Sequence, residues 1–388
     1  MIRNMNIFYW CPFLSKVATV QAVINSAISL KKYSKNKISP HIINAIGEWD
    51  DLEDLVNENN IGLIKLTKSK SIYKSLPRYS YFKSRLSYIF IGLYTSVSLF
   101  KFLKARNKGD IFVIHLISSL PLLLILLFNF KCKFILRISG YPKLNFLRRL
   151  LWKTCKKKLS IILCPTEDTK NDLIEKKIFK KEMFHILYDP VIEVKKISSL
   201  KKKNIKKNLV GKKFILNIGR LTDQKNQKML IEGFINFLKF DPNLYLVILG
   251  EGELESNLKK FVLKKNIENK VYFLGHVENV YNYLQKAKCF ILTSKWEDPG
   301  FVLIEAAFLK QTIISADCPN GPKEILQNGS GGYLFKSDDV NDLVNKYKQF
   351  DNDTDSNIKN KKLKTLKISK NYTCFNHYVL FNKILKLI

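Results

Sequence analysis

The sequence is poor in the residues that build disulfide and metal scaffolds. Its 388 residues include seven cysteines and five histidines, and neither kind shows the paired spacing of a disulfide framework or a zinc site. Several cysteines lie inside apolar runs, where cysteine packs as a small hydrophobic side chain. No secretory signal is recognisable at the N-terminus. These absences exclude a disulfide-rich secreted class, and they indicate that the chain works in a reducing cytoplasm.

Acidic residues and arginine are also scarce. The chain has 33 Asp and Glu against 66 Lys and Arg, a formal net charge of +33, and only eight of the 66 are arginine. An A/T-rich genome accounts for part of the lysine excess, and the remainder suits an anionic membrane surface as a partner. Charge alone leaves a non-enzymatic nucleic-acid-binding protein as an alternative. No helix-turn-helix, zinc or RNP-type pattern supports it, so no nucleic acid is expected as a partner.

Long uncharged runs are few. Residues 111–130 are long enough to span a membrane, but His115, Ser118, Ser119 and Pro121 divide them into a strand, a loop and a helix. Residues 86–100 form a shorter apolar run flanked by basic residues. They predict either a core helix or an amphipathic helix bound to a membrane surface.

What the sequence does contain is a series of short apolar runs, most of them followed by a helical pattern. Strands that alternate with helices at this spacing predict a parallel sheet, with ligands bound at the carboxyl ends of the strands. At 388 residues the chain is long enough for two such cores. The predicted strands of the C-terminal half lie in residues 214–220, 244–252, 271–276, 289–294 and 312–317.

Two glutamates eight positions apart flank the start of a predicted helix. Glu297 lies in a turn-rich loop, and Glu305 lies about one and a half turns into the helix that follows. Between them Gly300, Phe301 and Val302 offer backbone N–H groups to an anion. Two carboxylates around an anion site suit a nucleotide-sugar. The alternatives are an acidic loop before a core helix, or a glycoside hydrolase, whose two carboxylates must face each other across a sugar.

A second phosphate-binding element follows the predicted strand at residues 214–220. Gly219 ends the strand, Arg220 offers a planar fork of donors, and Lys225 opens the next helix as a mobile point charge. Together these two cations are able to hold a diphosphate. The alternative is that they are two of the many cations of a lysine-rich chain.

These motifs, in this order, resemble the nucleotide-sugar domain of a retaining GT-B glycosyltransferase of family 4, the glycosyl transferases group 1. The resemblance covers residues from about 212 to 345. It implies an α/β fold with two Rossmann-like domains, whose parallel sheets face a central cleft, and a C-terminal helix that crosses back to the N-terminal domain. The domains expected are an acceptor-binding domain at 1–194, a lysine-rich linker at 195–210, a nucleotide-sugar domain at 211–365 and a crossover helix at 366–388. The motifs that carry the resemblance are Gly219-Arg220 with Lys225, Gly250-Glu251-Gly252, Gly275-His276, the Glu297 and Glu305 pair, and residues 331–335.

The resemblance also implies roles. Arg220 and Lys225 would bind the diphosphate and balance the charge of the departing nucleotide, Glu297 would accept hydrogen bonds from sugar hydroxyls, and Glu305 would hold the ribose. No metal and no cofactor is expected, because cationic side chains and a helix terminus take their place. The predicted catalytic residues are Glu297, Arg220, Lys225 and His115, and the predicted donor-binding residues are Glu305, Gly300, Phe301, Val302, Gly219 and Asp298.

The N-terminal half resembles the family less. The loop after the first predicted strand, residues 11–19, contains no glycine, whereas family members usually have a glycine-rich loop there. Ser15 and Lys16 are candidate phosphate or acceptor contacts in this loop. His115 ends a predicted strand. It is either a contact to the sugar or acceptor, or a structural group. Arg137 and Ser139, around the end of the next strand, are candidate acceptor contacts.

The function predicted from these features is transfer of a sugar, with retention, from a UDP-hexose or UDP-HexNAc to a lipid-linked or polysaccharide acceptor. The setting implied is capsule or O-antigen biosynthesis by a cytoplasmic enzyme bound peripherally to the inner face of the membrane. A GDP-mannose-dependent mannosyltransferase of the same fold is an alternative.

Overall fold

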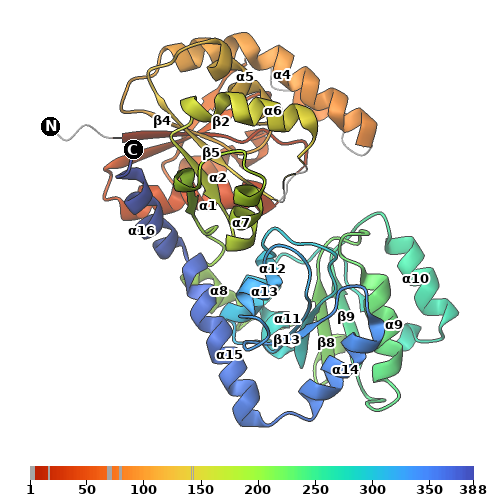
Figure 1. Ribbon diagram of the computed structural model, residues 1–388. Coiled ribbons are helices and arrows are strands. Elements are labelled where there is room, and N and C mark those ends of the chain that lie inside the picture. The colour runs from red at the N-terminus through yellow and green to blue at the C-terminus, as the bar shows by residue number, and fades with distance from the viewer. Residues whose placement is uncertain (1–4, 16–17, 68–71, 78–80, 141, 143) are drawn as a thin grey trace. The chain divides into compact units, whose positions relative to one another are not determined.

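The computed structural model describes residues 5–15, 18–67, 72–77, 81–140, 142 and 144–388, and for residues 81–84 it describes the backbone alone. The chain divides into two compact units (Figure 1). The N-terminal unit contains Met1–Pro190 and Cys374–Ile388, and the C-terminal unit contains Val191–Thr373. Each unit is an α/β structure around a parallel sheet, which confirms the predicted fold class of two Rossmann-like domains.

The N-terminal unit is built on a seven-stranded parallel sheet in the order β3-β2-β1-β4-β5-β6-β7. Its central strands are apolar on both faces, as expected for a sheet covered by helices on both sides. The chain reverses its direction of travel across the sheet between β1 and β4. The strands are β1 (Met5–Trp10), β2 (Ile38–Asn44), β3 (Gly62–Lys65), β4 (Ile111–Ile114), β5 (Lys133–Arg137), β6 (Ile161–Cys164) and β7 (Phe184–Ile186).

Helices and short 3-10 turns connect these strands. The apolar run at residues 111–130 divides into strand β4, a loop and helix α5, as predicted. The helices are α1 (Ala18–Tyr33), α2 (Glu53–Glu58), α3 (Ile72–Ser75), α4 (Tyr81–Lys104), α5 (Ser119–Leu127), α6 (Phe146–Cys155), α7 (Glu167–Glu175) and α16 (Cys374–Leu385), with 3-10 turns η1 (Asp50–Leu52), η2 (Lys156–Lys158) and η3 (Lys181–Met183).

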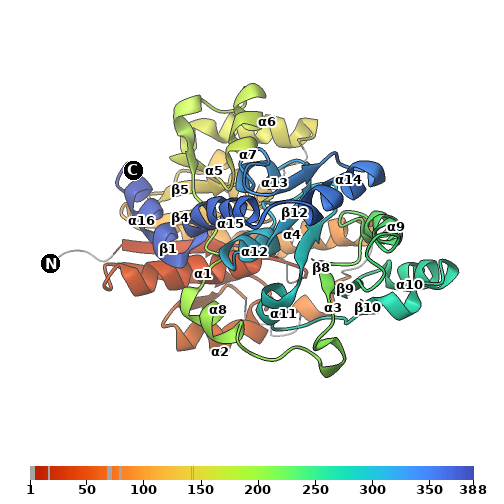
Figure 2. The ribbon, with the colours of Figure 1, turned by 90° about the horizontal axis from the view of Figure 1, so that it is seen from below.

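The last helix, α16, packs beside α1 in the N-terminal unit (Figure 2). His377 is 2% exposed, and its ring nitrogens hydrogen-bond Ser26 Oγ and the Tyr188 carbonyl, each at 2.7 Å. Ser29 Oγ donates to the carbonyl of Cys374 at 2.7 Å. These polar contacts and the surrounding apolar side chains fix residues 374–388 to a sheet that is built from the first 190 residues.

The C-terminal unit has a six-stranded parallel sheet in the order β10-β9-β8-β11-β12-β13. Its strands follow the predicted apolar runs, and the reversal in strand order falls between β8 and β11. They are β8 (Phe214–Ile218), β9 (Tyr245–Leu249), β10 (Val271–Phe273), β11 (Cys289–Leu292), β12 (Ile313–Ala316) and β13 (Tyr333–Phe335).

Two details of the C-terminal unit differ from the sequence prediction. The helix after β8, α9 (Gln227–Phe237), was predicted to begin at Lys225 but begins at Gln227. Asn226 has a left-handed φ of 50°, which the helix does not allow. The run expected as a linker contains a helix and a 3-10 turn. The helices are α8 (Val194–Leu200), α9 (Gln227–Phe237), α10 (Glu255–Lys264), α11 (Tyr281–Lys286), α12 (Phe301–Phe308), α13 (Pro322–Ile325), α14 (Val340–Asp351) and α15 (Asp355–Ser369), with 3-10 turns η4 (Lys207–Leu209), η5 (Glu268–Lys270) and η6 (Lys370–Tyr372).

Candidate functional site

The residues predicted to bind a nucleotide-sugar gather at the reversal in strand order of the C-terminal unit. The loops after β8 and β11 leave the sheet side by side there, and parallel α/β sheets bind ligands at such a point. Glycine lets the backbones come close. At Gly250, with φ +130°, an added Cβ would lie 2.0 Å from the carbonyl oxygen of Gly219, so no other residue fits without moving the chain.

Lys225 and Glu297 form an ion pair within this site. Lys225 Nζ lies 2.6 Å from Glu297 Oε1, and Ser294 Oγ donates to the same carboxylate oxygen at 2.5 Å. The Glu297 residue is 3% exposed, and its backbone N–H donates to the carbonyl of Pro319 at 3.1 Å. The pair therefore holds one negative and one positive charge at the strand end in a fixed arrangement, with Glu297 buried and Lys225 half-buried.

The loop that carries Glu297 ends at the N-terminus of α12. Gly300 precedes the helix with φ +92°, and no side chain caps the helix. The amides of Phe301 and Val302 belong to the first turn, where the helix provides no carbonyl partners. An added Cβ at Gly321 would lie 2.1 Å from the carbonyl oxygen of Pro299, so the next loop presses directly on this one. The result is a helix terminus with the geometry of an anion site, held in place by backbone packing.

Glu305 lies one turn further along α12 and is partly buried. Burial raises the pKa of its carboxyl to about 7, while the hydrogen bond from Tyr281 and the charge of Lys196 lower it. Tyr281 Oη donates to Glu305 Oε1 at 3.1 Å. Burial, together with the carboxylate of Glu305, raises the pKa of Tyr281, so its hydroxyl keeps its proton. The sequence prediction missed both Tyr281 and Ser294, since neither stands in a recognisable motif.

Arg220 follows β8 and is exposed. Its carbonyl accepts a hydrogen bond from Gln227 Nε2 at 3.0 Å, which fixes the backbone at this point. Among the residues that the structure describes, its guanidinium makes no ion pair. Gly219 begins the same turn, and its amide donates to the carbonyl of Leu249 at 2.9 Å. Asp298 stands directly after Glu297 in the loop before α12.

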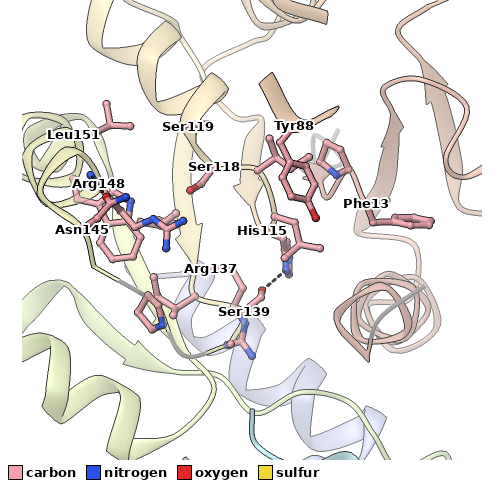
Figure 3. Close-up of a pocket in the computed structure, with 18 of the residues that line it drawn as sticks. Phe13, Tyr88, His115, Ser118, Ser119, Arg137, Ser139, Asn145, Arg148 and Leu151 are labelled. Carbon is pink, nitrogen blue, oxygen red and sulfur yellow. Dashed lines mark hydrogen bonds between the residues drawn. The ribbon is translucent and has the colours of Figure 1, made fainter. Parts of the chain in front are cut away.

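The N-terminal unit has a pocket of about 540 Å³ at its own reversal in strand order. The loops after β1, β4 and β5 form its floor, and helices α4 and α6 supply its walls. Figure 3 shows Asn145 and Arg148 on one side of this pocket and Tyr88 and His115 on the other. Of the predicted acceptor contacts, Ser15, His115, Arg137 and Ser139 line it, and Lys16 lies outside the described residues.

His115 directs its polar atoms to fixed neighbours. Its backbone N–H donates to the carbonyl of Trp10 at 2.9 Å, and its Nδ1 hydrogen-bonds Ser139 Oγ at 3.1 Å. Burial is the main cause that lowers the pKa of His115 well below its usual value, and the positive charge of Arg137 adds to it. The imidazole is therefore neutral. Within the described part of the chain its Nε2 is buried and has no hydrogen-bond partner.

Arg137 is committed to the protein itself. It is 3% exposed, and its Nη1 and Nη2 donate to the Leu187 carbonyl and to Asp189 Oδ1, each at 2.6 Å. The residue lines the pocket as a wall and ties β5 to the segment after β7. The pocket side chains of α4, of α6 and of the residue before α6 were not predicted from the sequence, because such a pocket has no motif of its own. They are Tyr88, Asn145, Leu147, Arg148, Leu151 and Trp152.

Comparison with known proteins places this arrangement in a family. Residues 166–365 match the family described as Glycosyl transferases group 1, over slightly more than half of the chain. The chain belongs to this family. The match begins just before α7 and ends within α15, so it includes every element of the predicted donor site described above.

The relatives that it matches are glycosyltransferases. The chain is 32% identical over 237 residues to an uncharacterized glycosyltransferase of Methanocaldococcus jannaschii, covering 56% of this chain and 58% of that protein. It is 28% identical over 312 residues to the GalNAc-alpha-(1->4)-GalNAc-alpha-(1->3)-diNAcBac-PP-undecaprenol alpha-1,4-N-acetyl-D-galactosaminyltransferase of Campylobacter jejuni, covering 77% and 82%. The chain spans little more than half the length of the first of these relatives.

A solved structure extends the likeness to the whole chain. The Anabaena protein Alr3699/HepE, crystallised in complex with UDP, superposes with a TM-score of 0.73 over 99% of this chain and all of the other. The two sequences are 13% identical, so this likeness concerns the fold. It is a GT-B glycosyltransferase fold, in agreement with the prediction.

Proposed function

We propose that the chain is a retaining glycosyltransferase of family 4 that transfers a hexose or N-acetylhexosamine from a UDP-sugar to a lipid-linked or polysaccharide acceptor. The observation that carries the proposal is the Lys225–Glu297 pair at the N-terminus of α12, with Glu305 one turn further along the same helix. The names of the relatives support it, since one acts on an undecaprenol-linked saccharide and a structural neighbour binds UDP.

In this proposal the positive groups hold the diphosphate. Arg220 and Lys225 bind its oxygens, and the amides of Phe301 and Val302 add the partial positive charge of the helix terminus. As the bond to the sugar breaks, negative charge develops on the departing UDP, and these fixed groups stabilise it without reorganising. The cations and helix terminus supply the neutralisation that a metal ion provides elsewhere. Activity is therefore expected to persist after treatment with EDTA, and its complete loss would refute the metal-independent mechanism.

The carboxylates orient the two ends of the donor. Glu297 is held by Lys225 and Ser294 and accepts hydrogen bonds from sugar hydroxyls through its second oxygen, while Glu305 accepts from the ribose hydroxyls. An ionised carboxylate is the stronger acceptor. Because the pKa of Glu305 is about 7 in the free protein, UDP affinity is expected to increase as the pH rises through that value.

The pocket of the N-terminal unit receives the acceptor in this proposal. His115 lines this pocket with a neutral imidazole, so it borders a sugar acceptor without adding charge. Ser15 and Ser139 line the same pocket and add hydroxyl groups. A lipid-linked acceptor would keep the enzyme on the cytoplasmic face of an anionic membrane as a peripheral protein.

A thermal-shift and calorimetry panel of nucleotides tests the donor site. We expect UDP and one UDP-sugar to raise the melting temperature, GDP and GDP-mannose to leave it unchanged, and Glu305→Gln to lose the response. Glu268→Gln, an exposed change in η5, is the matched control and should respond like the unchanged protein. A response to GDP-mannose alone would replace the UDP-sugar with that donor. No response to any nucleotide would refute the proposed function.

A further inference from the structure

Helices α4, α5 and α6 of the N-terminal unit expose an unusual amount of apolar surface. Of the 23 large apolar side chains that are exposed in the described residues, 14 belong to these helices or to the residue after α5. Leu93 is 74% exposed, Leu127 is 70% exposed and Phe146 is 77% exposed. Isolated exposed apolar side chains are ordinary, but a concentration of this kind marks an interaction surface.

The three helices are neighbours, so the exposed side chains form one surface. Helix α5 packs against both α4 and α6 (Figure 1). The rings of Phe100 in α4 and Phe128 after α5 lie 4.7 Å apart, and Cys155 Sγ of α6 contacts the Leu122 carbonyl of α5 at 3.2 Å. We call this surface, the outward side of α4, α5 and α6, the apolar face.

Along α4 the exposed and buried residues alternate at helical spacing. Leu86, Ile89, Leu93 and Val97 follow each other at three or four positions and are exposed, whereas Thr95, Leu99 and Leu103 on the other side are buried in the core. By length and composition residues 85–104 could cross a membrane, with a mean hydropathy of 1.5. The buried side argues against crossing, because it is packed on the unit. A helix packed in this way can meet a bilayer only with its exposed side, lying along the surface.

Charge identifies what the apolar face meets. Residues 81–166, which include all three helices, contain 16 Lys and Arg and one acidic residue, Asp110, which is buried. Helix α6 exposes Arg149 and Lys153, and the 3-10 turn η2 that follows it in the sequence exposes Lys156 and Lys157. Apolar side chains surrounded by basic ones complement an anionic bilayer, whose headgroups attract the cations while its acyl chains receive the apolar groups.

The apolar face is continuous with the pocket. Tyr88 of α4 and Leu147 of α6 are exposed on the face and also line the pocket, and Arg148 lies between Leu147 and Arg149 on the same helix. We propose that the apolar face docks on an anionic lipid bilayer and delivers a lipid-linked acceptor to the pocket directly from that bilayer. The docking stands on the exposed apolar and basic side chains, and the delivery rests on the proposed function.

Sedimentation of the full chain with lipid vesicles tests the docking. We expect binding to vesicles that contain phosphatidylglycerol, weaker binding to vesicles of phosphatidylcholine alone, and a loss of affinity between about 0.1 M and about 0.5 M salt, as counterions screen the cations. The triple variant Leu93→Gln/Val97→Gln/Phe146→Gln is expected to bind at least about tenfold more weakly, from the apolar area it removes from the lipid contact. None of its three positions lines the pocket.

Two further variants make the result specific. Arg149→Gln/Lys153→Gln/Lys157→Gln should weaken binding to anionic vesicles by at least about tenfold and leave the weak neutral binding unchanged. The matched control changes three exposed apolar residues of the C-terminal unit, Val210→Gln/Leu263→Gln/Leu363→Gln, and should bind like the unchanged protein. All variants should keep the melting temperature, since the altered side chains are exposed.

The outcomes separate the two proposals. UDP binding without vesicle binding would overturn the docking and leave the proposed function intact, whereas vesicle binding without any nucleotide binding would do the reverse. Equal binding of the control and the apolar triple variant would also overturn the docking. So would a concentration-dependent dimer that the apolar triple variant dissolves, because a second copy of the chain would then cover the face.

Discussion

Removing one member of the Lys225–Glu297 pair is predicted to destabilise the C-terminal unit as well as to impair catalysis. The two side chains are 18% and 4% exposed, with 2.6 Å between Nζ and Oε1. Removing one member of a fully buried ion pair costs about 3–5 kcal/mol, because the remaining charge is left without its partner. Lys225→Met leaves the Glu297 carboxylate with the hydrogen bond from Ser294, and Lys225 was partly solvated, so we expect the lower end, about 3 kcal/mol.

Glu297→Gln should cost less, about 1–2 kcal/mol, because the amide still accepts from Ser294 and the lysine gains water. In the double variant Lys225→Met/Glu297→Gln no charge remains to be desolvated. Its loss should therefore be smaller than the sum of the two single losses, by about 2 kcal/mol. This difference, the coupling energy, measures the interaction between Lys225 and Glu297. It does not require the loss in each single variant to be divided among its causes.

The free energy of unfolding of the C-terminal unit is the quantity to measure. Of the four tryptophans, Trp296 is the one that lies in this unit, next to Glu297. In fluorine NMR of fluorotryptophan-labelled protein in urea, the Trp296 signal therefore reports the unfolding of this unit, and the other three tryptophans report the N-terminal unit. The exposed pair Lys259–Glu255 is the control and should show a coupling of about 0.3–0.5 kcal/mol. Additive losses at Lys225 and Glu297, within about 0.5 kcal/mol, would refute the reasoning.

Three further predictions concern single residues. Tyr281→Phe removes a hydrogen bond that lowers the pKa of Glu305, so the rise of UDP affinity with pH should move to higher pH in calorimetric titrations; an unchanged midpoint would contradict this. Arg220→Ala should weaken UDP binding about tenfold and leave stability within about 0.5 kcal/mol, because its side chain is exposed. Burial lowers the pKa of His377 to about 3, so the unfolded chain alone takes up a proton below about pH 6.5. Near pH 5 this should lower the free energy of unfolding by about 2 kcal/mol. His377→Gln should reduce this dependence of the free energy of unfolding on pH, as measured by urea unfolding across the acid range.

The geometry of the candidate donor site was predictable because its constraints are local in the chain. A central parallel strand is apolar on both faces, and a strand end that packs closely against another loop favours glycine. Residues 244–252 show both features, an apolar run followed by Gly250 and Gly252, so the strand and the turn after it were predictable. The positions of Glu297 before a helix and of Glu305 within it were likewise predictable from the spacing of residues in a helix. The start of α9 was misplaced by two residues, because a left-handed Asn226 is not visible in a pattern of apolar positions.

The partners of these residues were not predictable, because packing brings them together across long separations. Tyr281 reaches Glu305 from a helix 24 positions earlier, and Asp189 reaches Arg137 from 52 positions later. Composition could not decide the position of α4 either. Its apolar residues suit a core helix as well as a surface helix, and the exposed row that includes Leu86, Leu93 and Val97 shows that it is a surface helix.

The contrast between the two candidate sites follows from what each is proposed to hold. A diphosphate is recognised by backbone amides and fixed charges, and close backbone approach allows no side chain at Gly250 or Gly321, where an added Cβ would lie 2.0 and 2.1 Å from a carbonyl oxygen. A lipid-linked acceptor needs an apolar and basic surface, which many sequences provide, so no motif marks it. The net charge of +33 is therefore informative through its distribution: a stretch with 16 basic residues and one buried acid coincides with the three helices that border the pocket. If lysine reflected genome composition alone, acidic residues would not be missing from this stretch in particular.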